Sequence, residues 1–257
     1  MHGHRARKRF GQNFLADAHY IARIIDAVAP RPGDNLVEIG PGLGALTDRL
    51  IERAARIAAI EIDRDLAARL RETHRPEQLA LHEGDALTFD FAVLGKDLRV
   101  VGNLPYNISS PLLFHLAGFD ASLRDIHVML QREVVMRMAA APATPDYGRL
   151  SVMLQAKFSV TRLFVIPPGA FQPAPKVDSA FVRLVPLGSA RPAIADERLF
   201  ARVVAAAFGQ RRKTLRNALA SLCDVAAIEG AGIDPAARGE TLSVADFVRL
   251  ANALTPR

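Results

Sequence analysis

The strongest constraint on the fold is an alternation, between residues 35 and 130, of short β-branched apolar runs with segments of helical spacing. The helical segments expected there are 45–53, 63–73 and 110–117, with Asp63 and Ser110 as N-caps. The expected strands are 35–39, 57–60, 79–83, 98–102 and 125–130. Strands that alternate with helices form a parallel sheet covered on both faces, so we predict a doubly wound α/β fold.

The later sequence extends this sheet and then changes character. A helix is expected over 131–140, and two further strands over 157–164 and 180–185 flank a Pro-rich loop at 167–175. Small and helix-breaking residues at 187–192 mark a domain boundary. We therefore predict a seven-stranded, mostly parallel Rossmann-like domain over 1–187, which begins with a basic arm (1–16), and a small all-helical domain over 188–257.

Composition excludes several classes of protein. Half of the 257 residues are hydrophobic, which is enough for a buried core. Apolar runs such as 203–208 are too short to cross a bilayer, and the basic N-terminus lacks the apolar stretch of a secretory signal. The single cysteine, Cys223, forms no internal disulfide, and Cys and His do not cluster as metal ligands. A metal-free protein of the reducing cytoplasm is expected.

Positive charge is concentrated at two places in the chain. Lys and Arg outnumber Asp and Glu by 33 to 27. One cluster is Arg5, Arg7, Lys8 and Arg9, and the other is Arg211, Arg212, Lys213 and Arg216. Such clusters suit a polyanion, but charge alone equally allows a solvated surface.

Residues 37–44 (VEIGPGLG) place a glycine-rich turn between the first strand and the first helix, where doubly wound folds bind nucleotide-like ligands. The dinucleotide fingerprint is absent, because Ala45 stands where its third glycine belongs and Gly44 comes one residue early. The acid Glu38 and the strand before the turn favour a ligand loop over a structural turn.

Two further acids end the next strands. Glu61, 21 residues after Gly40, is placed to accept both hydrogen bonds of a ribose diol, and its charge disfavours a phosphate there. Asp85 is placed to accept from an adenine amine. The alternatives are a surface acid at a strand end for Glu61 and a turn aspartate for Asp85.

Residues 103–106 (NLPY) follow the fourth strand, at the edge where a substrate would meet the reactive end of the cofactor. An exocyclic adenine nitrogen is a poor nucleophile because its lone pair is delocalised into the ring, and hydrogen-bond acceptors favour the more tetrahedral amine. Asn103 and a backbone carbonyl near Leu104 would accept its hydrogens, Pro105 would stiffen the turn, and Tyr106 would stack on an extruded base. A simple proline turn is the alternative.

Long segments spread along the chain carry a family resemblance. They are 7–15 (RKRFGQNFL), 38–44, 103–110 (NLPYNISS), 171–179 (FQPAPKVDS) and 208–217 (FGQRRKTLRN). With them the sequence resembles the bacterial small-subunit (16S) ribosomal RNA adenine N6,N6-dimethyltransferases, which are class I S-adenosylmethionine-dependent methyltransferases. At Gly239, alanine or proline would be expected from the resemblance.

The resemblance implies transfer of four methyl groups to two adjacent adenosines in a hairpin loop near the 3′ end of 16S rRNA, within the 30S subunit. The donor would be S-adenosylmethionine and the product S-adenosylhomocysteine, with no metal, and the protein would be a monomer. The cofactor contacts that it implies are Asn13, Leu15, Gly40, Glu61, Asp85 and Asn103.

RNA contacts follow from the same reading. A helix that begins near 211 would present Arg211, Arg212, Lys213 and Arg216 to phosphates, as Arg7, Lys8 and Arg9 would from the arm. Phe171 would either wall the target-base pocket beside Tyr106 or fill a hinge.

Three rival functions remain open. They are an adenine methyltransferase of large-subunit rRNA or DNA, a non-catalytic assembly or nucleic-acid-binding factor, and an NAD-dependent oxidoreductase. The last gives residues 103–106 no role, the short tail disfavours a DNA enzyme, and intact Asn103, Glu61 and Asp85 argue against lost catalysis.

Overall fold

The computed structural model of the chain describes residues 12–210 and 212–255. Its contacts divide the chain into two compact units, one formed by Met1–Val135 with Thr161–Pro186 and the other by Met136–Val160 with Leu187–Arg257. The boundary between Pro186 and Leu187 lies one residue before the predicted domain boundary. Met136–Val160, however, groups with the helical unit, whereas the prediction placed it in the sheet domain. The reason is packing: Val152 and Ala156 are buried in the same core as Phe200. No helix in the described ranges is long and apolar enough to span a membrane.

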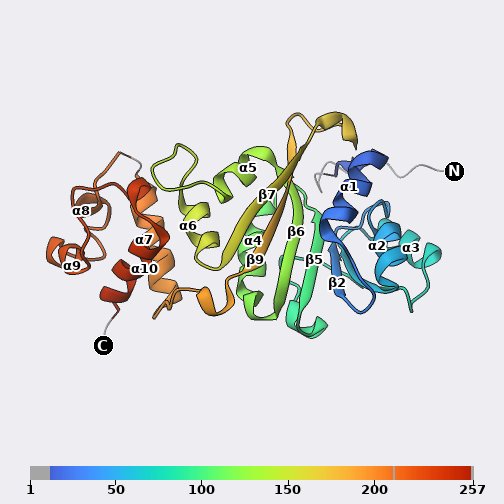
Figure 1. Cartoon of the computed structure of the whole chain (residues 1–257), viewed down its shortest axis with the longest axis horizontal. Coiled ribbons are helices and arrows are strands. Elements are labelled where there is room, and N and C mark those ends of the chain that lie inside the picture. The colour runs from blue at the N-terminus through green and yellow to red at the C-terminus, as the bar shows by residue number, and fades with distance from the viewer. Residues whose placement is uncertain (1–11, 211, 256–257) are drawn as a thin grey trace. The chain divides into compact units, whose positions relative to one another are not determined.

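The first unit is built on a seven-stranded sheet with the order β4-β3-β2-β5-β6-β9-β7 (Figure 1). Its strands are β2 (Asn35–Ile39), β3 (Ile57–Glu61), β4 (Leu79–Glu83), β5 (Leu98–Asn103), β6 (Leu123–Gln131), β7 (Phe158–Ile166) and β9 (Ser179–Pro186). Strands β2 to β6 pair in parallel, and β9 is antiparallel to β6. The predicted seven-stranded, mostly parallel sheet is therefore confirmed. The strand order reverses between β2 and β5, which is where such sheets open a crevice at their carboxyl ends.

Helices cover the sheet because each strand-to-strand crossover must return along one face. The first unit holds α1 (Ala18–Val28), α2 (Thr47–Ala54), α3 (Arg64–Thr73) and α4 (Ser109–Leu116), and α5 (Arg132–Met138) begins in it. Buried residues of α1 and α2 share one core with Val101 and Met129 of the sheet. Since side chains alternate along a strand, Val100 and Val128 face the opposite side.

The helix starts test the predicted caps. Asp63 caps α3, because its side chain accepts from the backbone of Asp65, as predicted. The prediction for Ser110 is wrong: α4 already begins at Ser109 after the N-cap Ile108, and no side chain caps it. The hydroxyl of Ser109 instead donates to the carbonyl of Pro105, at 3.1 Å, which ties the helix start to the preceding turn.

A second, two-stranded sheet was not predicted. β1 (Phe14–Leu15) pairs antiparallel with β8 (Phe171–Gln172), so that Leu15 lies opposite Phe171. The backbone N–H of Ala16 also donates to the carbonyl of Ala170, at 2.9 Å. Two-residue strands carry no periodicity that a sequence pattern could reveal, yet this pair fixes where the segment before α1 lies.

The helical unit contains α6 (Arg149–Gln155), α7 (Glu197–Gly209), α8 (Leu215–Ala218), α9 (Val225–Gly230) and α10 (Val244–Ala253). A capping box between Ser243 and Asp246 starts α10. Gly239 lies against α7, where a Cβ would come within 2.9 Å of the carbonyl oxygen of Ala207. Close packing therefore explains glycine at the position where alanine or proline was expected. Short 3₁₀ turns lie at Phe91–Leu94, Ala117–Ser122, Pro168–Ala170, Gly188–Ala190 and Gly239–Thr241.

Candidate active site

A cavity of about 260 Å³ opens at the carboxyl ends of β2, β3 and β5, within the first unit. This is the edge at which the strand order reverses, so the fold itself provides the crevice. The structure brings to it every predicted cofactor and catalytic residue. These are Asn13, Leu15, Gly40, Glu61, Asp85, Asn103, Leu104, Pro105 and Tyr106.

The glycine-rich turn forms one wall with its backbone. Gly40 and Gly42 adopt φ values of +67° and +60°, which favour glycine. A Cβ on Gly42 would come within 3.1 Å of the Phe14 ring. The backbone N–H of Gly40 donates to the carbonyl of Ile60 at 2.9 Å, which fixes the turn on the neighbouring strand. The Phe14 side chain therefore fills the space beside Gly42, whereas at Gly40, where a Cβ would come no nearer than 3.9 Å to the Asn103 carbonyl oxygen, a ligand can approach the peptide groups.

Glu61 is a buried acid at the end of β3, only 4% exposed. One carboxylate oxygen accepts from the N–H of Gly42 at 3.1 Å and the other from the N–H of Asp63 at 2.9 Å. Burial is the main influence on this carboxyl and raises its pKa, while the two backbone bonds act in the opposite direction. Each oxygen keeps a second lone pair for a further donor.

Glu38 is a second buried acid on the same cavity, and sequence reasoning gave it no role of its own. Its carboxyl accepts from the hydroxyl of Thr47, the first residue of α2, at 2.6 Å. Burial, with a smaller contribution from the nearby charge of Glu61, raises its pKa to about 8, although the hydrogen bond from Thr47 acts in the opposite direction. At neutral pH this side chain therefore holds a proton in the cofactor-free protein.

Asp85 lies just beyond β4 and lines the cavity. Its Oδ1 accepts from the N–H of Leu87 at 2.9 Å, which makes it a turn aspartate. The same side chain thus serves the local turn and still faces the cavity, so the two interpretations of the sequence are compatible.

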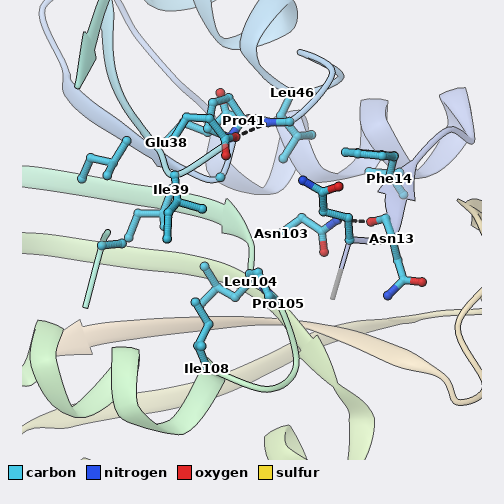
Figure 2. A pocket seen from close by; sticks show the side chains of 18 of the residues that line it. Asn13, Phe14, Glu38, Ile39, Pro41, Leu46, Asn103, Leu104, Pro105 and Ile108 are labelled. Atoms are coloured by element: carbon cyan, nitrogen blue, oxygen red, sulfur yellow. Dashed lines mark hydrogen bonds between the residues drawn. The ribbon is translucent and has the colours of Figure 1, made fainter. Parts of the chain in front are cut away.

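Asn103 ends β5 and is held by a residue far away in the sequence. Its Nδ2 donates to the backbone carbonyl of Asn13 at 2.8 Å, as Figure 2 shows. This bond directs the N–H side of the amide toward Asn13, and no described residue donates to Oδ1. A hydrogen-bond acceptor therefore remains at the cavity wall, beside the buried Leu104.

Tyr106 lines the same wall and is held from another direction. Its hydroxyl lies 2.6 Å from Oγ of Ser179, a fully buried side chain at the start of β9. Burial raises the pKa of the Tyr106 phenol, so it stays neutral. Ser179 lies within the segment 171–179, but sequence reasoning assigned it no role, since only the fold brings β9 to this turn.

Phe171 is 5% exposed and packs in the core that contains Leu15 and Ile24. It is not one of the described residues that line the cavity. This burial agrees with the interpretation in which Phe171 fills a hinge rather than walls a pocket. A role of Phe171 at the target base stays a prediction.

The predicted RNA contacts are only partly described. Arg7, Lys8, Arg9 and Arg211 lie outside the described residues, whereas Arg212, Lys213 and Arg216 are exposed on the helical unit. The prediction of one helix that carries this cluster is wrong, because α7 ends at Gly209 and α8 spans only Leu215–Ala218. The N–H groups of Leu215 and Arg216 donate instead to the carbonyls of Ala237 and Pro235, which turns the chain before α8.

The strand order, the acids at successive strand ends and the Asn103–Tyr106 turn together define a class I methyltransferase. Comparison with known proteins agrees. The model of the ribosomal RNA adenine dimethylase family matches residues 3–256. The chain belongs to this family.

Several named relatives match over almost their whole length. Ribosomal RNA small subunit methyltransferase A of Aromatoleum aromaticum is 63% identical over 257 residues, covering 100% of this chain and 97% of that protein. The protein of the same name from Thiobacillus denitrificans is 58% identical over 254 residues, covering 99% and 100%.

Two solved structures share the fold. A dimethyladenosine transferase from Plasmodium falciparum has a TM-score of 0.79 at 26% identity, covering 92% of this chain and 95% of that one. The 23S rRNA methyltransferase ErmE has a TM-score of 0.70 at 28% identity, covering 94% and 99%.

Proposed function

We propose that this chain uses S-adenosylmethionine to convert two adjacent adenosines, in a hairpin loop near the 3′ end of 16S rRNA, to N6,N6-dimethyladenosine. The observation that carries the proposal is the Asn103 amide at the cavity wall, whose Nδ2 is held by the Asn13 carbonyl so that Oδ1 is left to accept from a substrate. The substrate is the 30S subunit in the cytoplasm, and the protein acts as a monomer during ribosome assembly. The unit that contains the sheet is catalytic, and the helical unit with Arg212, Lys213 and Arg216 binds RNA.

The cavity fits the proposed cofactor. Both oxygens of Glu61 are anchored by backbone N–H groups and keep lone pairs for the two hydroxyls of a ribose. Asp85 uses Oδ1 in its turn, which leaves Oδ2 for the adenine amine. The bare backbone at Gly40 leaves room for the methionine portion.

The target amine is activated by position and hydrogen bonding. When bound, S-adenosylmethionine supplies a methyl group on a cationic sulfur, and as the N6 lone pair forms the new C–N bond the C–S bond breaks with its electron pair left on sulfur. Oδ1 of Asn103 and the carbonyl of Leu104 accept the two amine hydrogens and keep the lone pair on nitrogen. Tyr106 stacks on the base, and the surplus proton passes to water.

The test uses purified protein and labelled S-adenosylmethionine, and it offers, in separate reactions, small subunits from a strain that lacks this modification, large subunits and DNA. We expect N6,N6-dimethyladenosine at two adjacent positions by mass spectrometry, and no incorporation into subunits that already carry it. Label found only in large-subunit RNA or in DNA would overturn the assignment.

Likeness to ErmE supports a second candidate, methylation of large-subunit rRNA. The same experiment separates the two, because both subunits are offered to the enzyme. Cofactor binding without product on any substrate would instead support a non-catalytic assembly factor.

A further inference from the structure

We propose that Ser179 is a positioning residue that holds the Tyr106 ring against the target adenine, and that the second methyl transfer depends on it more than the first. The proposal rests on the proposed function and adds a residue that acts through Tyr106 without touching the substrate.

The contact itself is short, and its serine side is fully buried. The Tyr106 hydroxyl and Oγ of Ser179 are 2.6 Å apart, and Ser179 has no exposed surface. Its hydroxyl can therefore serve the tyrosine but cannot reach solvent or a base. An O–H···O bond of this length, closed to solvent on the serine side, restrains the ring at its far end.

Ser179 is also a rigid anchor. It pairs with Gln131 at the end of β6, and the carbonyl of the preceding Asp178 accepts from the N–H of Arg132 at 2.9 Å. Its backbone is therefore held against the end of β6. Tyr106, by contrast, lies in the turn after β5, next to the exposed Asn107. The bond transfers the rigidity of the β6–β9 ladder to a side chain on a turn.

The number of amine hydrogens makes the two transfers unequal. Unmodified adenine offers two N–H groups, which Asn103 Oδ1 and the Leu104 carbonyl accept. After one methyl transfer a single N–H remains, so one of the two hydrogen bonds that position the amine is lost. The base then depends more on stacking against Tyr106, and a looser ring slows the second transfer more than the first.

The experiment follows monomethyl- and dimethyladenosine over time, by mass spectrometry, in small subunits treated with each variant. Ser179→Ala and Tyr106→Phe remove the same bond from its two ends, and Ser159→Ala is the matched control, since Ser159 is an exposed serine on β7. We expect the ratio of the second rate constant to the first to fall about fivefold in both single variants, as for loss of one hydrogen bond. The double variant should show no further fall, and the control and the cofactor affinity should be unchanged.

A fall in both rate constants by the same factor would overturn the proposal, because a partly unfolded enzyme slows both steps alike. An unchanged ratio in Ser179→Ala, or additive effects in the double variant, would overturn it as well. If the wild-type protein made no dimethyladenosine on any subunit, the proposed function would fail instead, so the two failures are distinguishable.

Discussion

The cavity has a cofactor half and an amine half, and the hydrogen bonds that hold their side chains differ greatly in the sequence separation of the two partners. In the cofactor half, Glu61, Glu38 and Asp85 are anchored by partners between 2 and 19 residues away. In the amine half, Asn103 is anchored by Asn13, 90 residues away, and Tyr106 by Ser179, 73 residues away. The cofactor half is thus assembled within successive strand–turn–helix units, whereas the amine half exists only when distant segments of the chain meet.

This difference separates two kinds of defect. Loss of an anchor in the cofactor half should weaken binding while the amine half stays intact. Loss of an acceptor in the amine half should reduce turnover in a protein that still binds its cofactor. The following predictions test that separation, from the largest expected effect to the smallest.

Asn103→Ala should give the largest loss. Without Oδ1 the amine lone pair stays delocalised, and we expect kcat to fall by about 100-fold or more, in the range seen when one preorganised hydrogen bond at a reaction centre is removed. Calorimetry should find the cofactor Kd within about threefold of wild type. Equal losses in kcat and cofactor affinity would show that the two halves are not separable at this residue.

Glu61→Gln should have the opposite signature. An amide N–H₂ in place of one oxygen would face the backbone N–H of Gly42 or Asp63, and the charged acceptor for the ribose is lost. We expect the cofactor Kd to rise about 10- to 100-fold, with kcat at saturating cofactor largely kept.

Glu83→Gln is the matched control for Glu61→Gln. Glu83 lies beside Glu61 in the β3–β4 register, but it is exposed and pairs with Arg64 and Arg71. Its substitution should leave the cofactor Kd unchanged. A comparable weakening by both variants would contradict a specific role for Glu61.

The double variant Arg212→Ala with Lys213→Ala should affect neither half. Both side chains are exposed on the helical unit, and their loss should raise KM for the small subunit about three- to tenfold at constant kcat. The slope of log affinity against log salt should become shallower by about 1.5. Arg198→Ala, an exposed position on α7, is the control; an equal effect there would indicate general charge attraction rather than a defined contact.

The smallest effect concerns Glu38 and pH. Its native pKa of about 8 lies above the ordinary 4.5, so the folded protein binds a proton that the unfolded chain has released. Stability is therefore lost as pH rises from about 4.5 through 8, and it levels off above that window. Glu38→Gln removes this titration. The Tm of the variant minus that of wild type should therefore increase by on the order of 5 °C between pH 5 and pH 8, measured by calorimetry on the cofactor-free proteins. A Tm difference that is independent of pH would contradict the burial of a protonated carboxyl.

Sequence patterns determined most of the cofactor half. Alternating strands and helices predicted the sheet, and the glycine turn with Glu61 and Asp85 at successive strand ends predicted the cofactor wall, since parallel strands bring their carboxyl ends to one edge. The same local character made the Asp63 cap predictable. The run of positive charge near residue 211 also suggested one continuous helix. That prediction was wrong, because backbone hydrogen bonds to Pro235 and Ala237 turn the chain before α8.

Only the tertiary structure decided the amine half. The sequence singled out Asn103 and Tyr106, but it did not show that Asn13 orients the one or that Ser179 holds the other. Nor did it show that Gly239 is required by the backbone of α7, or that Phe171 pairs with Leu15 in a two-residue ladder. The physical reason is common to all four. Periodicity and capping act over one to four residues, whereas these contacts join segments that become neighbours only after the chain has folded.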